Sequence, residues 1–178
     1  MIEGYLAIVP YECIGSFSQM PRETFPELKR LRSAVLGFYE RAYGVTQATM
    51  FYEQGRAGAG ASVAEIGGFP LHAHLCSLPL ALDLHAVLAG KFVRKTVSGP
   101  EELSVVARDE PYVYVEDADE TAVYVASSSE GRAELTGMRL KTVIANLVGY
   151  PERGSWRTYP GDLELHKLKE NWRIYGKG

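Results

Sequence analysis

Two histidines and a cysteine alternate with apolar residues in the stretch FPLHAHLCSLP, which spans Phe69–Pro79. Side chains alternate between the two faces of a β-strand, so His72, His74 and Cys76 would all be directed at one surface. The apolar residues between them would face a core, and neighbouring polar side chains would lie roughly 7 Å apart. A neutral imidazole in such a line can attack an electrophile such as phosphorus and form a covalent intermediate. The spacing therefore indicates a strand on which histidine chemistry is feasible.

The same three side chains allow two other interpretations. Two imidazoles and a thiolate are ligands that suit Zn²⁺, so the line also fits a zinc site. Histidine and cysteine also occur in half-buried strands where they only pack. The pattern alone leaves catalysis, metal binding and packing open.

The elements around this strand predict an antiparallel sheet. We expect a strand at Gly4–Pro10, a helix at Thr24–Gly44, a strand at Ala48–Gln54, a glycine-rich loop at Gly55–Ser62 and the histidine strand at Pro70–Pro79. The helix is indicated by apolar residues at helical spacing, by Thr24 and Glu27 at capping-box spacing, and by Gly44 as a stop. Because a glycine-rich loop joins the two later strands, we expect a hairpin, helices segregated from the sheet, and an α+β fold.

Residues after Pro79 continue the same mixture of elements. We expect short helices at Leu80–Ala89 and Pro100–Ala107, two strands around an acidic turn in PYVYVEDADETAVYVAS, a helix at Ala133–Leu147 and a last helix at Asp162–Trp172. We assign residues 1–90 to a core and residues 91–178 to a C-terminal extension packed on it as one domain. If this extension folds over the histidine strand, Arg139 and Lys141 bring positive charge to it.

Composition and charge exclude several classes of protein. The 178-residue chain has 46% hydrophobic and 23% charged residues, as an ordinary globular domain has, and a net charge of −3. That charge does not favour nucleic acid or an anionic membrane, and no apolar run is long enough to span a membrane. Two cysteines are too few for a secreted disulfide framework, and MIEGYLAIVP has no positive leader. We therefore expect a cytoplasmic protein that binds neither nucleic acid nor membrane.

An ordered set of segments resembles the histidine-triad (HIT-like) superfamily. GYLAIVPYECIGSFSQMP is similar to the family's glycine-started strand that ends in Ile-Pro, and LHAHLCSLP resembles its His-x-His-x-His signature strand. Tyr52–Gly55 is similar to a segment that precedes the signature in some bacterial members. The segments PYVYVE and RLKTVIANLVGYPERGSWR resemble the C-terminal extension of the larger members. The match covers roughly residues 1–80 most closely and implies a HIT-like antiparallel sheet with flanking helices plus a C-terminal α/β extension.

The resemblance implies a nucleotidyl hydrolase or transferase. In this family the middle signature histidine attacks the α-phosphorus of a nucleotide, so the resemblance makes His74 the nucleophile and His72 its neighbour at the phosphate. Cys76 takes the third position, beside the leaving group. Four further residues are candidates for binding a nucleotide-type substrate: Glu53, Gln54, Arg56 and Gly68. Family members commonly form homodimers, so we expect one here.

Several departures from the family pattern keep other functions open. Cys76 replaces the third histidine, and Cys13 stands where the upstream strand often carries a histidine. A thiol is a poor proton donor at pH 7, so an active enzyme would need a good leaving group. The two cysteines with His72 also suggest a Zn²⁺ site, or a nucleotide- or partner-binding protein without catalysis. By the resemblance, Met1 falls inside the family's fold, so we expect the strand and helix that precede this point in the family to be missing. Phe69 replaces a phosphate-binding serine of some members.

Overall fold

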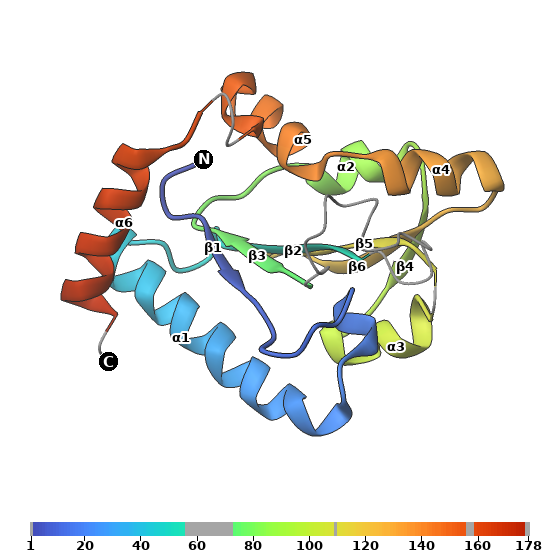
Figure 1. Cartoon of the computed structure of the whole chain (residues 1–178), viewed down its shortest axis with the longest axis horizontal. Helices are drawn as coiled ribbons and strands as arrows, with labels where there is room; N and C mark the ends of the chain where they lie inside the picture. Colours follow the sequence, from blue (N-terminus) through green and yellow to red (C-terminus); the bar gives the residue numbers. More distant parts are fainter. Residues whose placement is uncertain (1, 56–72, 109, 156–158, 177–178) are drawn as a thin grey trace.

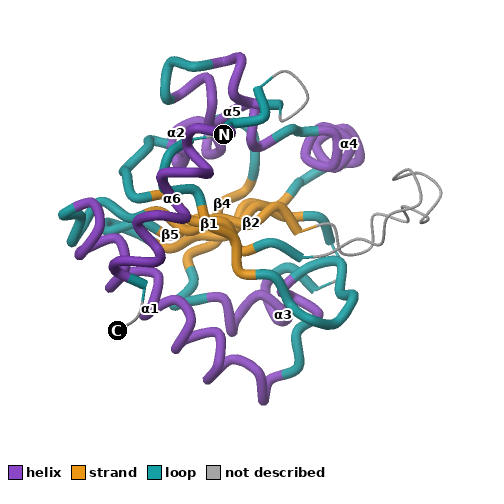
Figure 2. Tube along the Cα trace, turned by 60° about the vertical axis from the view of Figure 1, so that its left-hand side comes forward, coloured by secondary structure: helices purple, strands orange, loops and turns teal. Residues whose placement is uncertain are grey.

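The computed structural model describes residues 2–55, 73–108, 110–155 and 159–176. A single β-sheet forms the middle layer, and helices cover both of its faces (Figure 1). The chain is therefore α+β with an antiparallel sheet, as the sequence predicts. The helices lie on both faces rather than on one side of the sheet (Figure 2).

The sheet has six strands in the order β1-β3-β2-β5-β6-β4, and every neighbouring pair is antiparallel. The strands are β1 (Leu6–Ile8), β2 (Met50–Gly55), β3 (Leu75–Leu78), β4 (Val93–Thr96), β5 (Tyr112–Glu116) and β6 (Thr121–Val125). The strands predicted at Gly4–Pro10 and Ala48–Gln54 and the two around the acidic turn are confirmed, and β2 pairs with β3 as expected of a hairpin. Of the strand predicted at Pro70–Pro79, only Leu75–Leu78 is confirmed: residues 73–74 precede it, and residues 70–72 lie outside the described ranges. β5 pairs with β2, so the sheet runs without a break from the core into the C-terminal extension.

The helices form two groups about the sheet. They are α1 (Phe25–Tyr43), α2 (Leu84–Ala89), α3 (Leu103–Val106), α4 (Ser129–Gly137), α5 (Leu140–Leu147) and α6 (Asp162–Tyr175), with 3-10 turns η1 (Phe17–Gln19), η2 (Arg22–Thr24), η4 (Pro100–Glu102) and η5 (Pro151–Gly154). α1 and α3 cover one face, α2, α4 and α5 cover the other, and α6 packs against α1 (Figures 1 and 2). None of the helices in the described ranges is both long and apolar enough to cross a bilayer.

Strand alternation gives the sheet a hydrophobic core on each face. Phe51 and Leu75 pack in the first core with side chains of α1 and α3. Tyr52, Cys76 and Leu78 pack in the second core with side chains of α2, α4 and α5. The surface at which the sequence directs Cys76 is covered by helices from the C-terminal extension.

The helix predicted at Thr24–Gly44 is confirmed as α1, and Gly44 ends it in the left-handed conformation with φ 67°. Its start differs from the expected capping box. Thr24 makes no side-chain cap to the helix, because its hydroxyl donates to the carbonyl of Pro21 at 2.6 Å. The preceding turn η2 therefore supplies the entry to α1.

The single helix predicted at Ala133–Leu147 is two helices, α4 and α5. The chain leaves the helical conformation at Met138, whose ψ is 135°. Gly137 has low helix propensity, and Gln54 of β2 donates to the last carbonyls of α4 at Leu135 and Met138. A long-range contact from the sheet thus accompanies a break that the apolar periodicity does not show.

Candidate functional site

His74 immediately precedes β3 and is exposed, while the residues on either side of it are buried. Ala73 is 2% exposed and its N–H donates to the carbonyl of Ile14 at 2.7 Å; Leu75 is fully buried. The backbone that carries the imidazole is therefore fixed on both sides. An exposed imidazole on an anchored backbone is accessible to a substrate from solvent.

Cys76 follows on the same face as His74 but is closed off from solvent. Its side chain is 4% exposed, its Sγ lies 3.0 Å from the Tyr5 hydroxyl, and it donates weakly to the His74 carbonyl at 3.7 Å. Burial raises the pKa of the Cys76 thiol, an effect that the hydrogen bond from Tyr5 and the nearby charge of Lys141 oppose only in part. The group stays a neutral thiol at pH 7, so it is a weak nucleophile and a weak acid.

Glu53 lies on the opposite face of the sheet from Cys76. Tyr52 is the cross-strand partner of Cys76, so alternation turns the next residue toward α1 and α3. The Glu53 carboxyl is 1% exposed and accepts hydrogen bonds from the Phe17 N–H at 2.7 Å and the Tyr112 hydroxyl at 2.5 Å. Burial raises its pKa to about 7, against the lowering effect of those two donors. One oxygen holds η1 against the sheet and the other is bonded to Tyr112 of β5, so binding a substrate would require one of these contacts to break.

Gln54 shares the Cys76 face, yet its amide is also engaged. Its Nε2 donates to the carbonyls of Leu135 at 3.0 Å and Met138 at 2.8 Å. Helix-end carbonyls lack partners within their own helix, so this side chain satisfies two groups at the end of α4. Gln54 therefore connects β2 of the sheet to the end of α4.

Three of the sequence candidates, His72, Arg56 and Gly68, lie outside the described residues. Cys13 is exposed while Cys76 is buried. Within the described ranges, no group of three or more histidine, cysteine or acidic side chains is arranged to hold a metal ion. The proposed Zn²⁺ site therefore gains no support from the described part of the chain.

The C-terminal extension folds over the Cys76 face, which brings Lys141 to it. The Lys141 Nζ lies 5.4 Å from the centre of the Tyr5 ring, and its charge acts on Cys76. Tyr5 and Tyr52 both line a cavity here with Lys141. Two sequence signals indicate this grouping. Lys141 is expected at the histidine strand if the extension folds over it, and Tyr52 and Cys76 fall on one face if their strands pair in this register.

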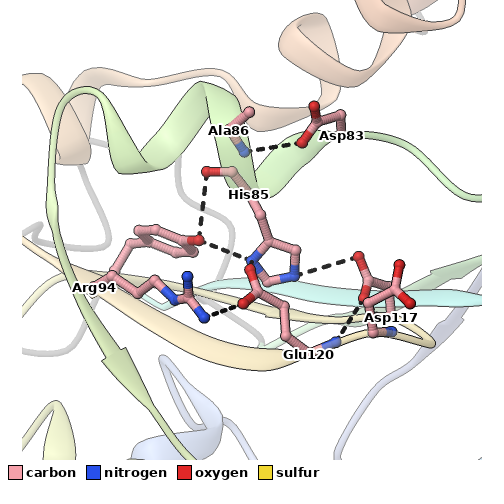
Figure 3. A network of polar contacts seen from close by, with 8 residues as sticks. Asp83, His85, Ala86, Arg94, Asp117 and Glu120 are labelled. Atoms are coloured by element: carbon pink, nitrogen blue, oxygen red, sulfur yellow. Dashed lines mark hydrogen bonds and ion pairs between the residues drawn. The ribbon is translucent and has the colours of Figure 1, made fainter.

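A second polar cluster surrounds His85 on α2 (Figure 3). It lies at the β6–β4 end of the sheet, and β1 forms the opposite edge. The His85 Nδ1 lies 2.8 Å from the Tyr124 hydroxyl and 2.9 Å from a Glu120 oxygen, and its Nε2 lies 3.4 Å from an Asp117 oxygen. Glu120 also pairs with Arg94 of β4. The cluster joins α2, the β5–β6 turn and the edge strand β4, so His85 has a structural role.

Comparison with models of known protein families finds no match to this chain, and a search of curated proteins finds no relative. The resemblance to the histidine-triad superfamily therefore stays a prediction that rests on the order of segments in the sequence.

Proposed function

We propose that the protein is a HIT-like nucleotidyl hydrolase or transferase in which His74 is the nucleophile. The observation that carries the proposal is the exposed His74 imidazole at the start of β3, between two buried and anchored residues. The ordered resemblance of residues 1–80 to the family supports it. The resemblance implies a nucleotide phosphoanhydride, phosphoramidate or nucleotide-sugar as substrate. The neutral, buried Cys76 thiol favours the phosphoanhydride and the nucleotide-sugar, because the amine of a phosphoramidate leaves only when it is protonated.

The proposed reaction has two steps at phosphorus. A ring nitrogen of His74 donates its electron pair to the α-phosphorus, and the bond to the leaving group breaks with its electron pair. Water or an acceptor hydroxyl then attacks the nucleotidyl-histidine, loses a proton and releases the imidazole. Since the Cys76 thiol is neutral and buried, the leaving group must be stable without strong protonation, as pyrophosphate and sugar phosphates are.

A panel of nucleotides tests the proposal through turnover. We expect His74→Ala to lower turnover of the preferred substrate at least about a thousandfold, because the nucleophile is lost. His166→Ala is the matched control, since His166 is an exposed histidine on α6. Turnover that is equal in the His74→Ala variant and the wild type would rule out the mechanism.

A second candidate function is a nucleotide- or partner-binding protein without catalysis. The burial of Cys76 against Tyr5 favours it, because the third position of the signature then offers no side chain to a substrate. This alternative predicts saturable nucleotide binding that survives His74→Ala, with no turnover of any member of the panel.

A further inference from the structure

A small cavity opens on the second face of the sheet, beyond Cys76 along β3. Its volume is about 80 Å³, and it lies between the sheet, the N-terminal segment, α5 and η5. The residues that line it are Ile2, Tyr5, Tyr52, Leu78, Lys141, Ile144, Ala145, Arg153 and Gly154. We call it the tyrosine cavity. His74 is not among its lining residues, so it is a separate feature from the proposed catalytic group.

Two phenol groups supply hydrogen-bond donors in the tyrosine cavity. Burial raises the pKa of Tyr5 and of Tyr52 well above the ordinary value, so both hydroxyls keep their protons at neutral pH. The Tyr5 hydroxyl lies 3.0 Å from the Cys76 Sγ, and Tyr52 is the cross-strand partner of Cys76. Since each of these groups carries a proton, the chain can turn a donor toward an incoming acceptor.

The charged residues that line the tyrosine cavity are both cations, Lys141 and Arg153. Arg153 is balanced in part, because its guanidinium pairs with Glu164 at 3.3 Å and packs over the rings of Tyr150 and Tyr159. Lys141 makes no ion pair with another described residue and lies over the Tyr5 ring. The cavity therefore has a positive charge at one side without a matching carboxylate in its lining.

The remaining walls are apolar and come from Ile2, Leu78, Ile144 and Ala145. An apolar pocket with a few convergent polar groups is the usual form of a small-molecule site. The volume of about 80 Å³ is well below the roughly 300 Å³ and more of sites for drug-sized ligands, so it suits only a few heavy atoms. A nucleotide does not fit this description, and inorganic phosphate would leave the apolar walls unused.

We propose that the tyrosine cavity binds a small carboxylate with a short, branched apolar body. The carboxylate lies at Lys141 and accepts from the Tyr5 and Tyr52 hydroxyls, and the apolar body packs against Leu78 and Ile144. This site does not depend on His74 or on the proposed nucleotidyl transfer.

Calorimetric titration with isobutyrate tests the proposal, with isobutyramide as the neutral isostere and inorganic phosphate as the anion without an apolar body. We expect saturable binding of isobutyrate and at least about tenfold weaker binding of the other two, because the site uses both charge and apolar contact. Lys141→Met should weaken isobutyrate binding at least about tenfold, and Tyr52→Phe should weaken it less. Lys29→Met, which removes an exposed lysine from α1 on the opposite face, should leave binding unchanged.

Any of these results would overturn the proposal: no saturable binding of isobutyrate by the wild type, equal binding of isobutyramide, tighter binding of phosphate, or unchanged affinity in Lys141→Met. His74→Ala must bind isobutyrate as the wild type does. Loss of binding in that variant would place the ligand at His74 and would also overturn the assignment to the tyrosine cavity. Because the lysine variant changes an exposed side chain, its outcome does not depend on repacking of a core.

Discussion

Burial decides what Cys76 can contribute to chemistry. In the sequence it stands two residues after His74, where a third histidine would hold a proton for the leaving group. In the structure its thiol is neutral, covered by helices and hydrogen-bonded to Tyr5. The proposed enzyme is therefore restricted to substrates whose leaving group departs as a stable anion.

The raised pKa of the single residue Glu53 predicts how the stability of the protein depends on pH. Its folded-state pKa of about 7 lies above the ordinary value of 4.5, so the folded state holds the proton more tightly than the unfolded state. The stabilising contribution is complete below pH 4.5 and is lost as the pH rises through about 7. Between these values we expect the free energy of unfolding of the wild type to fall by about 3 kcal/mol relative to Glu53→Gln.

Urea unfolding of both proteins across this pH range measures the difference. Glu27→Gln is the control, because Glu27 is an exposed carboxylate on α1 and its removal should give no such trend. A constant difference between the wild type and Glu53→Gln from pH 4 to pH 8 would contradict an uncharged, buried Glu53 carboxyl.

At the scale of elements, Gln54 connects β2 to the end of α4. We expect Gln54→Ala to destabilise the protein by about 1–3 kcal/mol, because two helix-end carbonyls lose their donor. Thermal unfolding measures the loss, and hydrogen exchange should quicken first at the amides of α4. Gln47→Ala is a matched control at an exposed position. Equal stability of the two variants would show that the Gln54 amide does not hold α4.

The elements show why part of this fold can be predicted from the sequence. α1 combines helical spacing with a glycine stop. β5 and β6 are short runs of apolar and aromatic residues on either side of an acidic turn, so local signals define all three elements. β4 is missed because all four of its residues are exposed and two of them are charged, so it has no apolar alternation. It exists through its pairing with β6, which is a long-range contact.

In the candidate site, too, the sequence predicts what local signals define and misses what long-range contacts determine. Alternation along the histidine strand places Ala73 and Leu75 in one core and Cys76 on the other face, as predicted. It does not reveal what covers that face, because Tyr5 and Lys141 come from distant parts of the chain. The role of Glu53 was equally hidden, since its partners belong to η1 and β5.

For the whole molecule, the sheet unites the segments before and after residue 90. β2 pairs with β5 over five residue pairs, and β5, β6, α4 and α5 supply half of the buried residues of the second core. We expect a truncated chain of residues 1–90 not to unfold cooperatively, because β2 loses a neighbour and the Cys76 face loses its cover. Thermal melts followed by circular dichroism test this expectation. A sharp transition in the truncated chain would show that the first half folds alone.

The central claim is that His74 attacks phosphorus, and intact-protein mass spectrometry after incubation with the nucleotide panel tests it most directly. The account predicts a mass increase of one nucleotidyl group with at least one substrate, with the modification mapped to His74. The increase should be absent in His74→Ala and present in His166→Ala. Either of two results would contradict the account. One is an adduct that persists in His74→Ala. The other is a wild-type protein that turns the nucleotide over but carries no adduct when the reaction is quenched in the steady state.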